Sequence, residues 1–171
     1  KDGKVDLMTQ KEIMEKFPLG WDYLLKNKKV LESRENGRFK ETWWSFSRPQ
    51  NMTEFETSKI ITPDICNKPE MTIDLNGGMY HTTTVFGIVL KDNVKVNLKY
   101  LLGILNSNVM WYFQTQTGTI LRGGFRRFHK QYVEPFPIAT AKEKHQKTIE
   151  NLVDFILFLK EHNANSHSIS M

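Results

Sequence analysis

The chain of 171 residues has the length of one ordinary domain, so we expect a single core. Apolar residues make up 39% and charged residues 25%, a composition typical of globular proteins that excludes a disordered or fibrous chain. The longest apolar runs, such as Phe155–Leu159, are far too short for a membrane-spanning helix. The chain opens on Lys1 without an initiator Met, which suggests a segment of a longer protein.

Charge is concentrated in one stretch of the chain. The net charge is +5, and residues 122–139, with four basic residues and one acid, carry more than half of it. The bases Arg122, Arg126, Arg127 and Lys130 are interleaved with aromatic residues, a pattern typical of surfaces that meet phosphates. The alternative is a solvated hairpin whose bases pair with acids elsewhere in the fold.

Residues that carry enzyme chemistry are not grouped into any known motif. The single cysteine, Cys66, has no disulfide partner and no Cys or His at metal-ligand spacing, which favours a reducing compartment, with the cytoplasm as the default location. The five histidines include no i,i+4 pair, and no nucleophile elbow or phosphate-binding glycine loop is present. We therefore assign no catalytic residue, no metal ligand and no cofactor-binding residue.

The first third of the chain favours helices. Thr9 and Glu12 have capping-box spacing and predict a short helix that Pro18 ends. A second helix is expected over residues 20–35, with Asn36 and Gly37 at its end because both tolerate positive φ. Its apolar residues fall on one face.

The middle of the chain is predicted to be β structure. Aromatic and β-branched residues, separated by turn residues, indicate short strands over residues 42–47, 59–62, 71–75 and 84–90. Asn76 and Gly77 favour a hairpin turn between Asn76 and Tyr80.

Two long helices are predicted in the rest of the chain, with the basic stretch between them. Asn97 is expected to cap the first helix, which continues to about Thr117. Its apolar stripe includes Val109 and Tyr112, which are expected to point inward. A β hairpin is then expected to carry the basic stretch. The final helix spans residues 140–162, and residues 163–171 are expected to form a disordered tail. The residues of this final helix that are expected to point inward are Ile149, Leu152, Val153, Ile156, Leu157 and Leu159.

Phe155 and Phe158 lie off that inward stripe, which predicts a helix that is apolar on two sides and docks against a partner. Together these elements predict an α+β fold: a mixed, twisted β-sheet core flanked by helices, with a long amphipathic C-terminal helix.

Several segments, taken in order, resemble a known family. The matching segments are Leu31–Glu35, Trp44–Asn51, Lys59–Ile65, Tyr100–Ser107, Thr117–Gly118, Leu121–Gly124, Lys130–Tyr132 and Pro135–Ile138. Over about residues 20–138 the chain resembles the C-terminal target-recognition, or specificity, domain of Taq-type adenine-specific DNA methyltransferases. The same domain occurs in single-chain restriction-modification enzymes. The ending, helix, Thr-Gly, strand, Pro-x-Pro, helix, is also similar to type I restriction specificity subunits.

The resemblance implies a module that recognises a sequence in double-stranded DNA within a larger type II modification enzyme. It divides the chain into a linker with a short helix (1–19), a DNA target-recognition domain (20–139), a docking helix (140–162) and the tail. The partners implied are duplex DNA and the catalytic methyltransferase domain of the same parent chain, and no membrane. A protein–protein docking module of a larger assembly is the alternative.

The same resemblance places methyl transfer outside this chain. Such enzymes bind S-adenosylmethionine at a glycine-rich loop and hold the flipped base with an Asn-Pro-Pro-aromatic or Asp-Pro-Pro-aromatic motif. No two of the six prolines are adjacent here, and no such loop is present. We therefore expect no cofactor in this chain and S-adenosylmethionine in the parent enzyme. Whether the parent also carries a nuclease domain stays open.

Candidate DNA contacts fall in two places. Arg122, Arg126, Arg127 and Lys130 are the phosphate candidates, with one Arg as a reader of guanine. Because strand residues alternate, Arg126 and Arg127 are expected to point to opposite faces. Gly123 and Gly124 allow close approach to DNA, or form a turn or bulge.

The second place is a loop between predicted strands, where Arg48, Gln50 and Asn51 have side chains that pair with guanine or adenine in the major groove. The alternative is that these residues only form a turn beside Pro49. A third hypothesis is RNA binding, in which Phe125 and Phe128 stack on unpaired nucleotides.

Overall fold

The computed structural model describes residues 7–47 and 52–167, with side chains described up to residue 163. The chain divides into two compact units, Lys1–Glu54 and Phe55–Met171. This differs from the expected single domain, because the boundary lies inside the segment 20–139. The physical reason is that each unit buries aromatic or aliphatic residues in a core of its own.

Within its described residues the first unit contains three α-helices, α1 (Gln10–Lys16), α2 (Pro18–Lys26) and α3 (Lys28–Gly37). The capping box that starts α1 is confirmed: the Thr9 hydroxyl accepts from the Glu12 amide at 3.2 Å, and the Glu12 carboxylate accepts from the Thr9 amide at 2.8 Å. The prediction of one helix over 20–35 is wrong. The helix is interrupted at Asn27, whose side chain donates to the carbonyl of Tyr23 at 2.9 Å. The expected positive φ angles at residues 36 and 37 are confirmed.

The predicted strand over residues 42–47 is also wrong, because Arg34 binds this segment. The short 3₁₀ helix η1 (Lys40–Thr42) is followed by turns, and the Arg34 guanidinium donates to the carbonyls of Trp43 (2.8 Å) and Ser45 (3.0 Å) and to the Ser47 hydroxyl (3.1 Å). Trp43 is buried and lies against Trp21 with ring centroids 5.2 Å apart. The aromatic residues of this segment therefore build a small core instead of a strand. The 3₁₀ helix η2 (Met52–Glu54) closes the unit.

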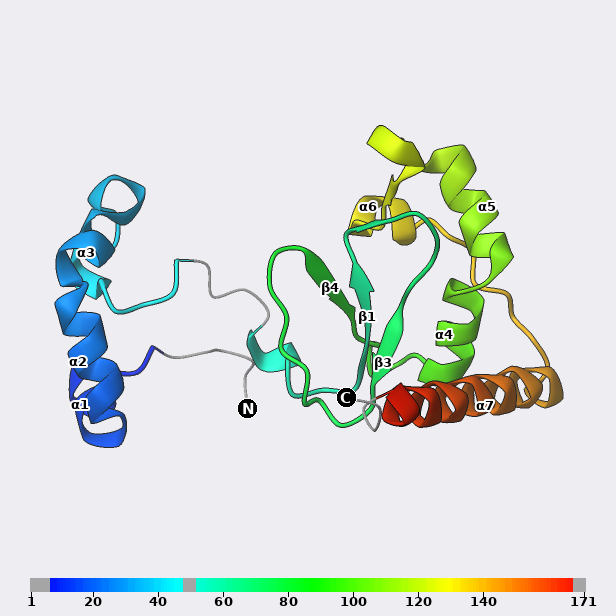
Figure 1. Cartoon of the computed structure of the whole chain (residues 1–171), viewed down its shortest axis with the longest axis horizontal. Helices are drawn as coiled ribbons and strands as arrows, with labels where there is room; N and C mark the ends of the chain where they lie inside the picture. The colour runs from blue at the N-terminus through cyan, green and yellow to red at the C-terminus, as the bar shows by residue number, and fades with distance from the viewer. Residues whose placement is uncertain (1–6, 48–51, 168–171) are drawn as a thin grey trace. The chain divides into compact units, whose positions relative to one another are not determined.

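The second unit is built on a three-stranded antiparallel sheet (Figure 1). The central strand β1 (Lys59–Pro63) pairs with β3 (Thr72–Asp74) on one side and β4 (Val85–Ile88) on the other, so Ile60 faces Ile73 and Ile88. A separate antiparallel pair joins β2 (Ile65–Cys66) to β5 (Arg126–Arg127). The α+β class is confirmed, but the predicted mixed sheet is not found among the described strands, because every pairing there is antiparallel.

The predicted hairpin between Asn76 and Tyr80 is wrong, because β3 and β4 lie on opposite sides of β1. The chain after β3 is instead turned by Asp74, whose carboxylate accepts from the amides of Asn76 (3.2 Å), Gly78 (3.1 Å) and Met79 (2.8 Å). The same buried carboxylate pairs with the buried ammonium of Lys59 at 2.7 Å. This arrangement fixes the start of a long connection to β4.

The predicted long helix from Asn97 is two helices, α4 (Leu98–Leu105) and α5 (Asn108–Thr117). Asn97 caps α4 as expected. The break comes at Asn106, whose side chain bonds both the amide and the carbonyl of Met71 at 2.9 Å. The break changes the buried face of α5.

Two residues of the predicted inward stripe, Val109 and Tyr112, are therefore exposed, whereas Met110 and Gln114 are buried.

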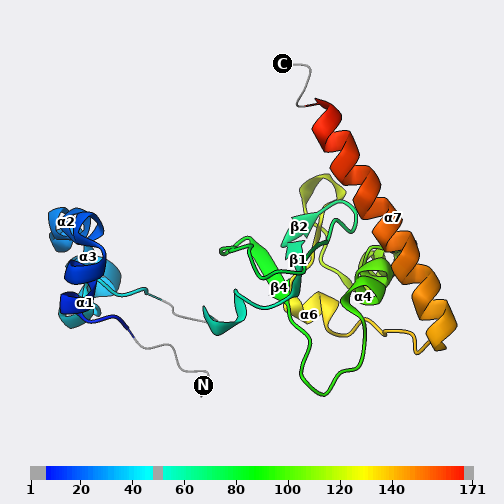
Figure 2. The ribbon, with the colours of Figure 1, turned by 90° about the horizontal axis from the view of Figure 1, so that it is seen from below.

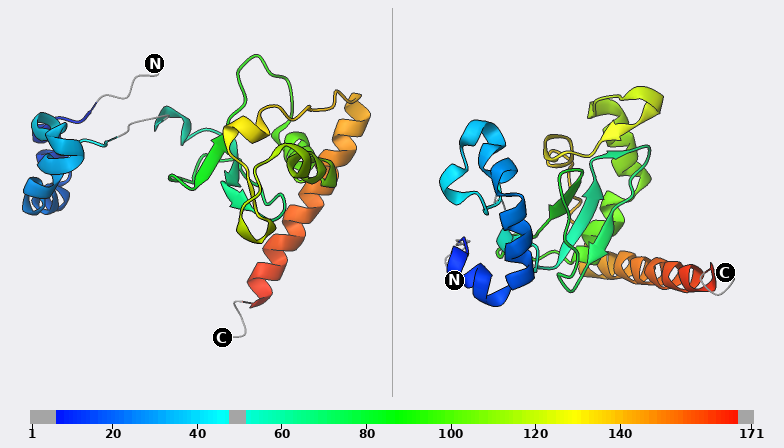
Figure 3. Two further views of the ribbon diagram at one scale, coloured as in Figure 1. Left: turned by 90° about the horizontal axis from the view of Figure 1, so that it is seen from above. Right: turned by 60° about the vertical axis from the view of Figure 1, so that its left-hand side comes forward.

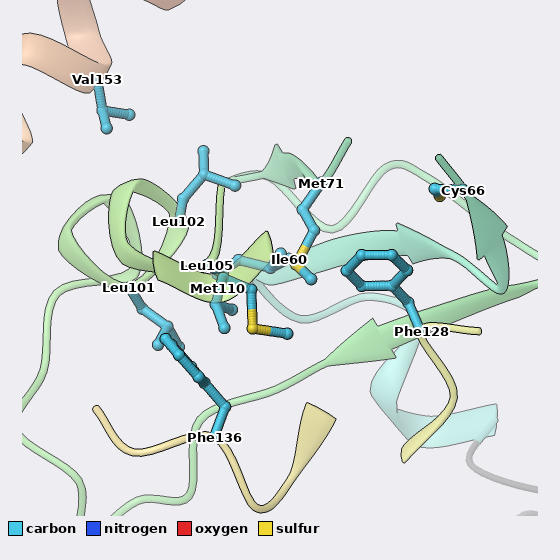
Figure 4. Close-up of a cluster of buried hydrophobic side chains, with 10 residues drawn as sticks. All are labelled: Ile60, Cys66, Met71, Leu101, Leu102, Leu105, Met110, Phe128, Phe136 and Val153. Carbon is cyan, nitrogen blue, oxygen red and sulfur yellow. The ribbon is translucent and has the colours of Figure 1, made fainter. Parts of the chain in front are cut away.

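Figure 4 shows the core between α4 and the sheet. Leu101, Leu102 and Leu105 of α4 lie beside Ile60 of β1 and Met110 of α5. The segment that follows α5 forms the 3₁₀ helix η3 (Arg122–Gly124), β5 and α6 (Lys130–Val133), and it contributes two further aromatic core residues, Phe128 and Phe136.

The last helix, α7 (Glu143–His167), packs against α4 (Figure 2). Val153 is buried there, and a Cβ atom placed on Gly103 of α4 would lie 2.6 Å from Ile149 of α7, so the two helices are in close contact. The helix continues five residues beyond the predicted end at residue 162, so residues 163–167 of the expected disordered tail are helical. The remaining four residues lie outside the described part.

Only half of the predicted inward face of α7 is correct. Val153 is buried and Ile149 and Leu157 are partly buried, but Leu152, Ile156 and Leu159 are exposed. One helix packed on one neighbour buries only a narrow stripe, and the other side is left uncovered by the described residues. Within the described residues, no helix is long and apolar enough to cross a membrane.

Candidate nucleic-acid interface

The basic stretch forms a closed loop between α5 and α6, which we call the basic loop and define as residues 118–130. Ile120 and Arg126 form an antiparallel bridge. Inside this bridge, the amide of Leu121 donates to the carbonyl of Phe125 at 2.8 Å, and the amide of Gly124 donates to the carbonyl of Leu121 at 3.1 Å. The prediction of a hairpin in this stretch is thus correct for the bridge, while β5 pairs with the distant strand β2.

Gly123 and Gly124 occupy the tip of the loop, with φ angles of +82° and +81°. Other residues adopt such angles only at a cost of about 1–2 kcal/mol each. The geometry of the turn is therefore enough to explain why both residues are glycine, and this supports the interpretation of the pair as a turn. Close approach to DNA stays a prediction.

Two residues that the sequence did not reveal as important anchor the loop. Gln114 of α5 is fully buried, and its side-chain amide donates to the carbonyl of Tyr132 in α6 at 2.9 Å. The Tyr132 hydroxyl lies 2.6 Å from the hydroxyl of Thr119 at the start of the loop. This bond, followed by a bond to Gln131 and the charge of Arg127, lowers the pKa of Tyr132. A polar Gln inside an apolar helical stripe was the signal that could have identified the anchor.

The four predicted phosphate contacts do not behave alike. Arg122 and Lys130 are exposed, and Lys130 forms a loose surface ion pair with Glu134 at 3.9 Å. Arg127 points outward, and its guanidinium lies 3.5 Å from the carboxylate of Asp64.

Arg126 points inward, so the two adjacent arginines lie on opposite faces, as strand alternation predicts. Its Nη1 donates to the carbonyl of Gly118 at 3.4 Å, and its Nε is buried. Three cations therefore face solvent, and the fourth supports the loop.

The aromatic residues of the loop also divide into two kinds. Phe128 is buried in the core, so it is not available to stack on a nucleotide, and the RNA hypothesis loses one of its two rings. Phe125 remains 39% exposed at the end of the loop.

The other predicted base-reading residues, Arg48, Gln50 and Asn51, lie outside the described residues. The segment that leads to them is described, and it is held by the Arg34 hydrogen bonds reported above. Among the described residues, no cluster of His, Cys, Asp or Glu has the make-up of a metal site. Burial raises the pKa of the Cys66 thiol to about 11, with smaller contributions from Glu70 and Asp64.

The predicted docking residues lie on the side of α7 that faces away from α4. Phe155 is 58% exposed and Phe158 is 53% exposed. Together with Leu152, Ile156 and Leu159 they form an apolar surface, which we call the outer face of α7. Figure 3 shows no other described element of the second unit over this side of the helix.

Comparison with known protein families supports the resemblance drawn from the sequence. The chain matches the family described as the TaqI-like C-terminal specificity domain over residues 12–138. The match begins in α1 and runs through both compact units, so residues 12–19, predicted as part of a linker, lie inside the matched segment. It ends before α7. Because the match covers well over half of the 171 residues, the chain belongs to the family of TaqI-like C-terminal specificity domains.

Proposed function

We propose that this chain is the part of a type II adenine-specific DNA methyltransferase, or restriction-modification enzyme, that recognises a sequence in double-stranded DNA. The observation that carries the proposal is the basic loop. It presents Arg122, Arg127 and Lys130 to solvent from a rigid, hydrogen-bonded support within a specificity-domain family.

Phosphates and bases are expected to be contacted by different residues. The exposed cations of the basic loop bind phosphates and set the register of the domain on the duplex. Arg48, Gln50 and Asn51 are proposed to read base edges, because their side chains form paired hydrogen bonds with guanine or adenine. Gly123 and Gly124 keep the tip of the loop free of side chains where the backbone approaches the DNA.

Methyl transfer is assigned to the catalytic domain of the parent chain. We propose that S-adenosylmethionine is bound there, because the family resemblance places the glycine-rich cofactor loop in that domain. Extracting a base from the stack costs a few kcal/mol, and a second domain on the duplex helps to hold the open geometry. The single cysteine, which has no disulfide partner in the chain, supports a cytoplasmic location, and we propose this location for the parent.

A second function, docking, is favoured by the outer face of α7. Phe155, Phe158 and their apolar neighbours are proposed to pack against the catalytic domain of the same parent chain. Phe155 and Phe158 are more than half exposed, and their removal from water by a partner lowers the free energy of the complex.

The central test compares binding of the whole chain to duplex DNA, single-stranded DNA and RNA of one sequence at one salt concentration. We expect the duplex to bind most tightly, and one duplex sequence to be preferred among many. Equal or tighter binding to RNA would contradict the proposal, as would the absence of any duplex binding. Phe155→Glu with Phe158→Glu is the control, because these residues belong to docking and should leave duplex affinity unchanged.

A further inference from the structure

The basic loop carries one aromatic ring, that of Phe125, which is partly exposed to solvent. Phe125 is 39% exposed, although its neighbour Phe128, three residues later, is buried in the core. The Phe125 backbone is fixed by the bond from Leu121 at 2.8 Å. Its ring lies against Gly123, since a Cβ atom placed on that glycine would be 3.4 Å from the ring. Phe125 is thus held in place and partly open to solvent.

The surroundings of this ring favour a nucleic acid over an apolar protein surface. Residues 118–130 contain four cations and no acid. Arg122 precedes the ring by three residues and is exposed, and Arg127 follows it by two and points outward. A flat aromatic ring among cations matches a ligand that has flat bases and a negative backbone.

We propose that Phe125 stacks on a base left without a stacking partner where the DNA duplex is opened. The inference rests on the proposed function, because it gives the basic loop a second role at the same duplex. Arg122, Arg127 and Lys130 hold the phosphates, and Phe125 supplies a face that only an unstacked base can reach. The loop then favours an opened duplex over a closed one.

Rigidity makes the ring effective in this role. The loop is closed by the Ile120–Arg126 bridge and joined to α6 through the Thr119–Tyr132 hydroxyl contact at 2.6 Å. Little conformational entropy therefore remains to be lost when the ring meets a base. Stacking of one base on one aromatic ring corresponds to roughly a tenfold change in affinity.

The test uses the whole chain and one duplex in two forms, fully paired and with one base opposite an abasic sugar. Wild-type chain is expected to bind the abasic form roughly tenfold more tightly. Phe125→Ala should bring this ratio close to one, and Phe125→Tyr should retain it. Phe125→Leu keeps an apolar side chain but has no aromatic face, so it should also lose the preference.

Ile120→Ala is the matched control, because Ile120 lies on the same loop and is 68% exposed but has no ring. It should leave the ratio unchanged. An unchanged melting temperature shows that each variant is folded. A preference that survives Phe125→Ala, or duplex binding without any preference in the wild type, overturns this inference alone. Failure to bind any duplex overturns the proposed function itself.

Discussion

The basic loop and the outer face of α7 are two exposed surfaces of the same unit, and they lie at opposite ends of it in Figure 1. The loop is polar at its edge and is fixed by hydrogen bonds from three elements. The face of α7 is apolar, belongs to one helix and is supported from behind by α4.

This contrast shows that exposure alone does not define a binding surface. Charges act over about 10 Å at ordinary ionic strength and weaken in salt, whereas apolar contacts act only where surfaces touch and do not weaken in salt. The two surfaces are therefore expected to respond differently to salt and to substitution.

The largest effect is expected when the buried ion pair between Asp74 of β3 and Lys59 of β1 is removed, because both surfaces belong to the unit built on this sheet. Asp74→Ala removes the acceptor of three backbone amides and the carboxylate that balances the buried Lys59 charge, and it leaves the ammonium only the carbonyls of Phe55 and Thr57. We expect the melting temperature to fall by roughly 10 °C or more, with loss of both DNA binding and self-association. Asp92→Ala, at an exposed aspartate between β4 and α4, should change little. A stable Asp74→Ala variant would show that the pair does not support the unit.

The next effect separates the loop from α7 by salt. Three phosphate contacts by Arg122, Arg127 and Lys130 give a slope of log affinity against log salt of about −2.7, so a fourfold rise in salt weakens binding roughly 40-fold. Because Arg126 points inward, Arg126→Ala with Arg127→Ala should make the slope shallower by about 1, rather than 2.

Lys91→Ala with Lys95→Ala removes two exposed cations elsewhere in the unit and should leave the slope unchanged. If the Arg126 and Arg127 variant keeps the wild-type slope and affinity, the DNA lies elsewhere on the domain.

The third prediction concerns the outer face of α7. Without a catalytic partner, its apolar surface should drive self-association of the chain, visible in light scattering as a mass above that of one chain. Phe155→Glu with Phe158→Glu should reduce the mass to that of one chain and leave the salt slope of DNA binding unchanged. Glu143→Gln with Glu161→Gln changes the net charge by an equal amount in the opposite direction, at exposed positions off the apolar stripe, and should have no effect. A wild-type chain that is strictly monomeric would count against docking.

The smallest effect is a dependence of stability on pH. Hydrogen bonds from the Lys59 ammonium and the Met79 amide lower the pKa of Asp74, against the opposing effect of burial. A carboxyl with a lowered pKa stabilises the fold above its ordinary pKa of about 4, and this stabilisation is lost as pH falls below that value.

The urea midpoint should therefore decrease from pH 5 to pH 3, and less steeply in Asp74→Asn. Parallel curves for the two proteins would assign the acid sensitivity to other groups.

Features of the fold that depend on neighbouring residues were predictable. The Thr9 capping box, the Asn97 cap and the positive φ at Asn36 follow from residues within four positions of each other. Strands β1, β3 and β4 were found from their β-branched residues.

Features that depend on distant partners were not predictable. The break at Asn106 depends on Met71, which is 35 residues away. The predicted strand after Thr42 failed because of Arg34, and the hairpin at Asn76 failed because the sheet places β1 between β3 and β4. Periodicity carries no information about such contacts.

The candidate site shows the same division. Its cations were identified from local charge, and strand alternation correctly predicted that Arg126 and Arg127 point to opposite faces, although not which of them points inward. The ion pair of Arg127 with Asp64 and the anchor formed by Gln114 and Tyr132 join separate elements, so only the fold reveals them.

Gly103 lies at a contact from which a small tilt of α7 would become a larger displacement at the far end of the helix. A Cβ atom at this position would lie 2.6 Å from the Ile149 side chain, so we expect Gly103→Ala to tilt α7 away from α4 near the N-terminal end of α7. A helix of 25 residues is about 37 Å long, and a tilt of about 5° at that end displaces the other by about 3 Å. One methyl group at residue 103 can therefore change the direction in which the whole outer face of α7 points. In the docking proposed for this face, residue 103 would therefore set the angle between this chain and a catalytic domain from within the fold.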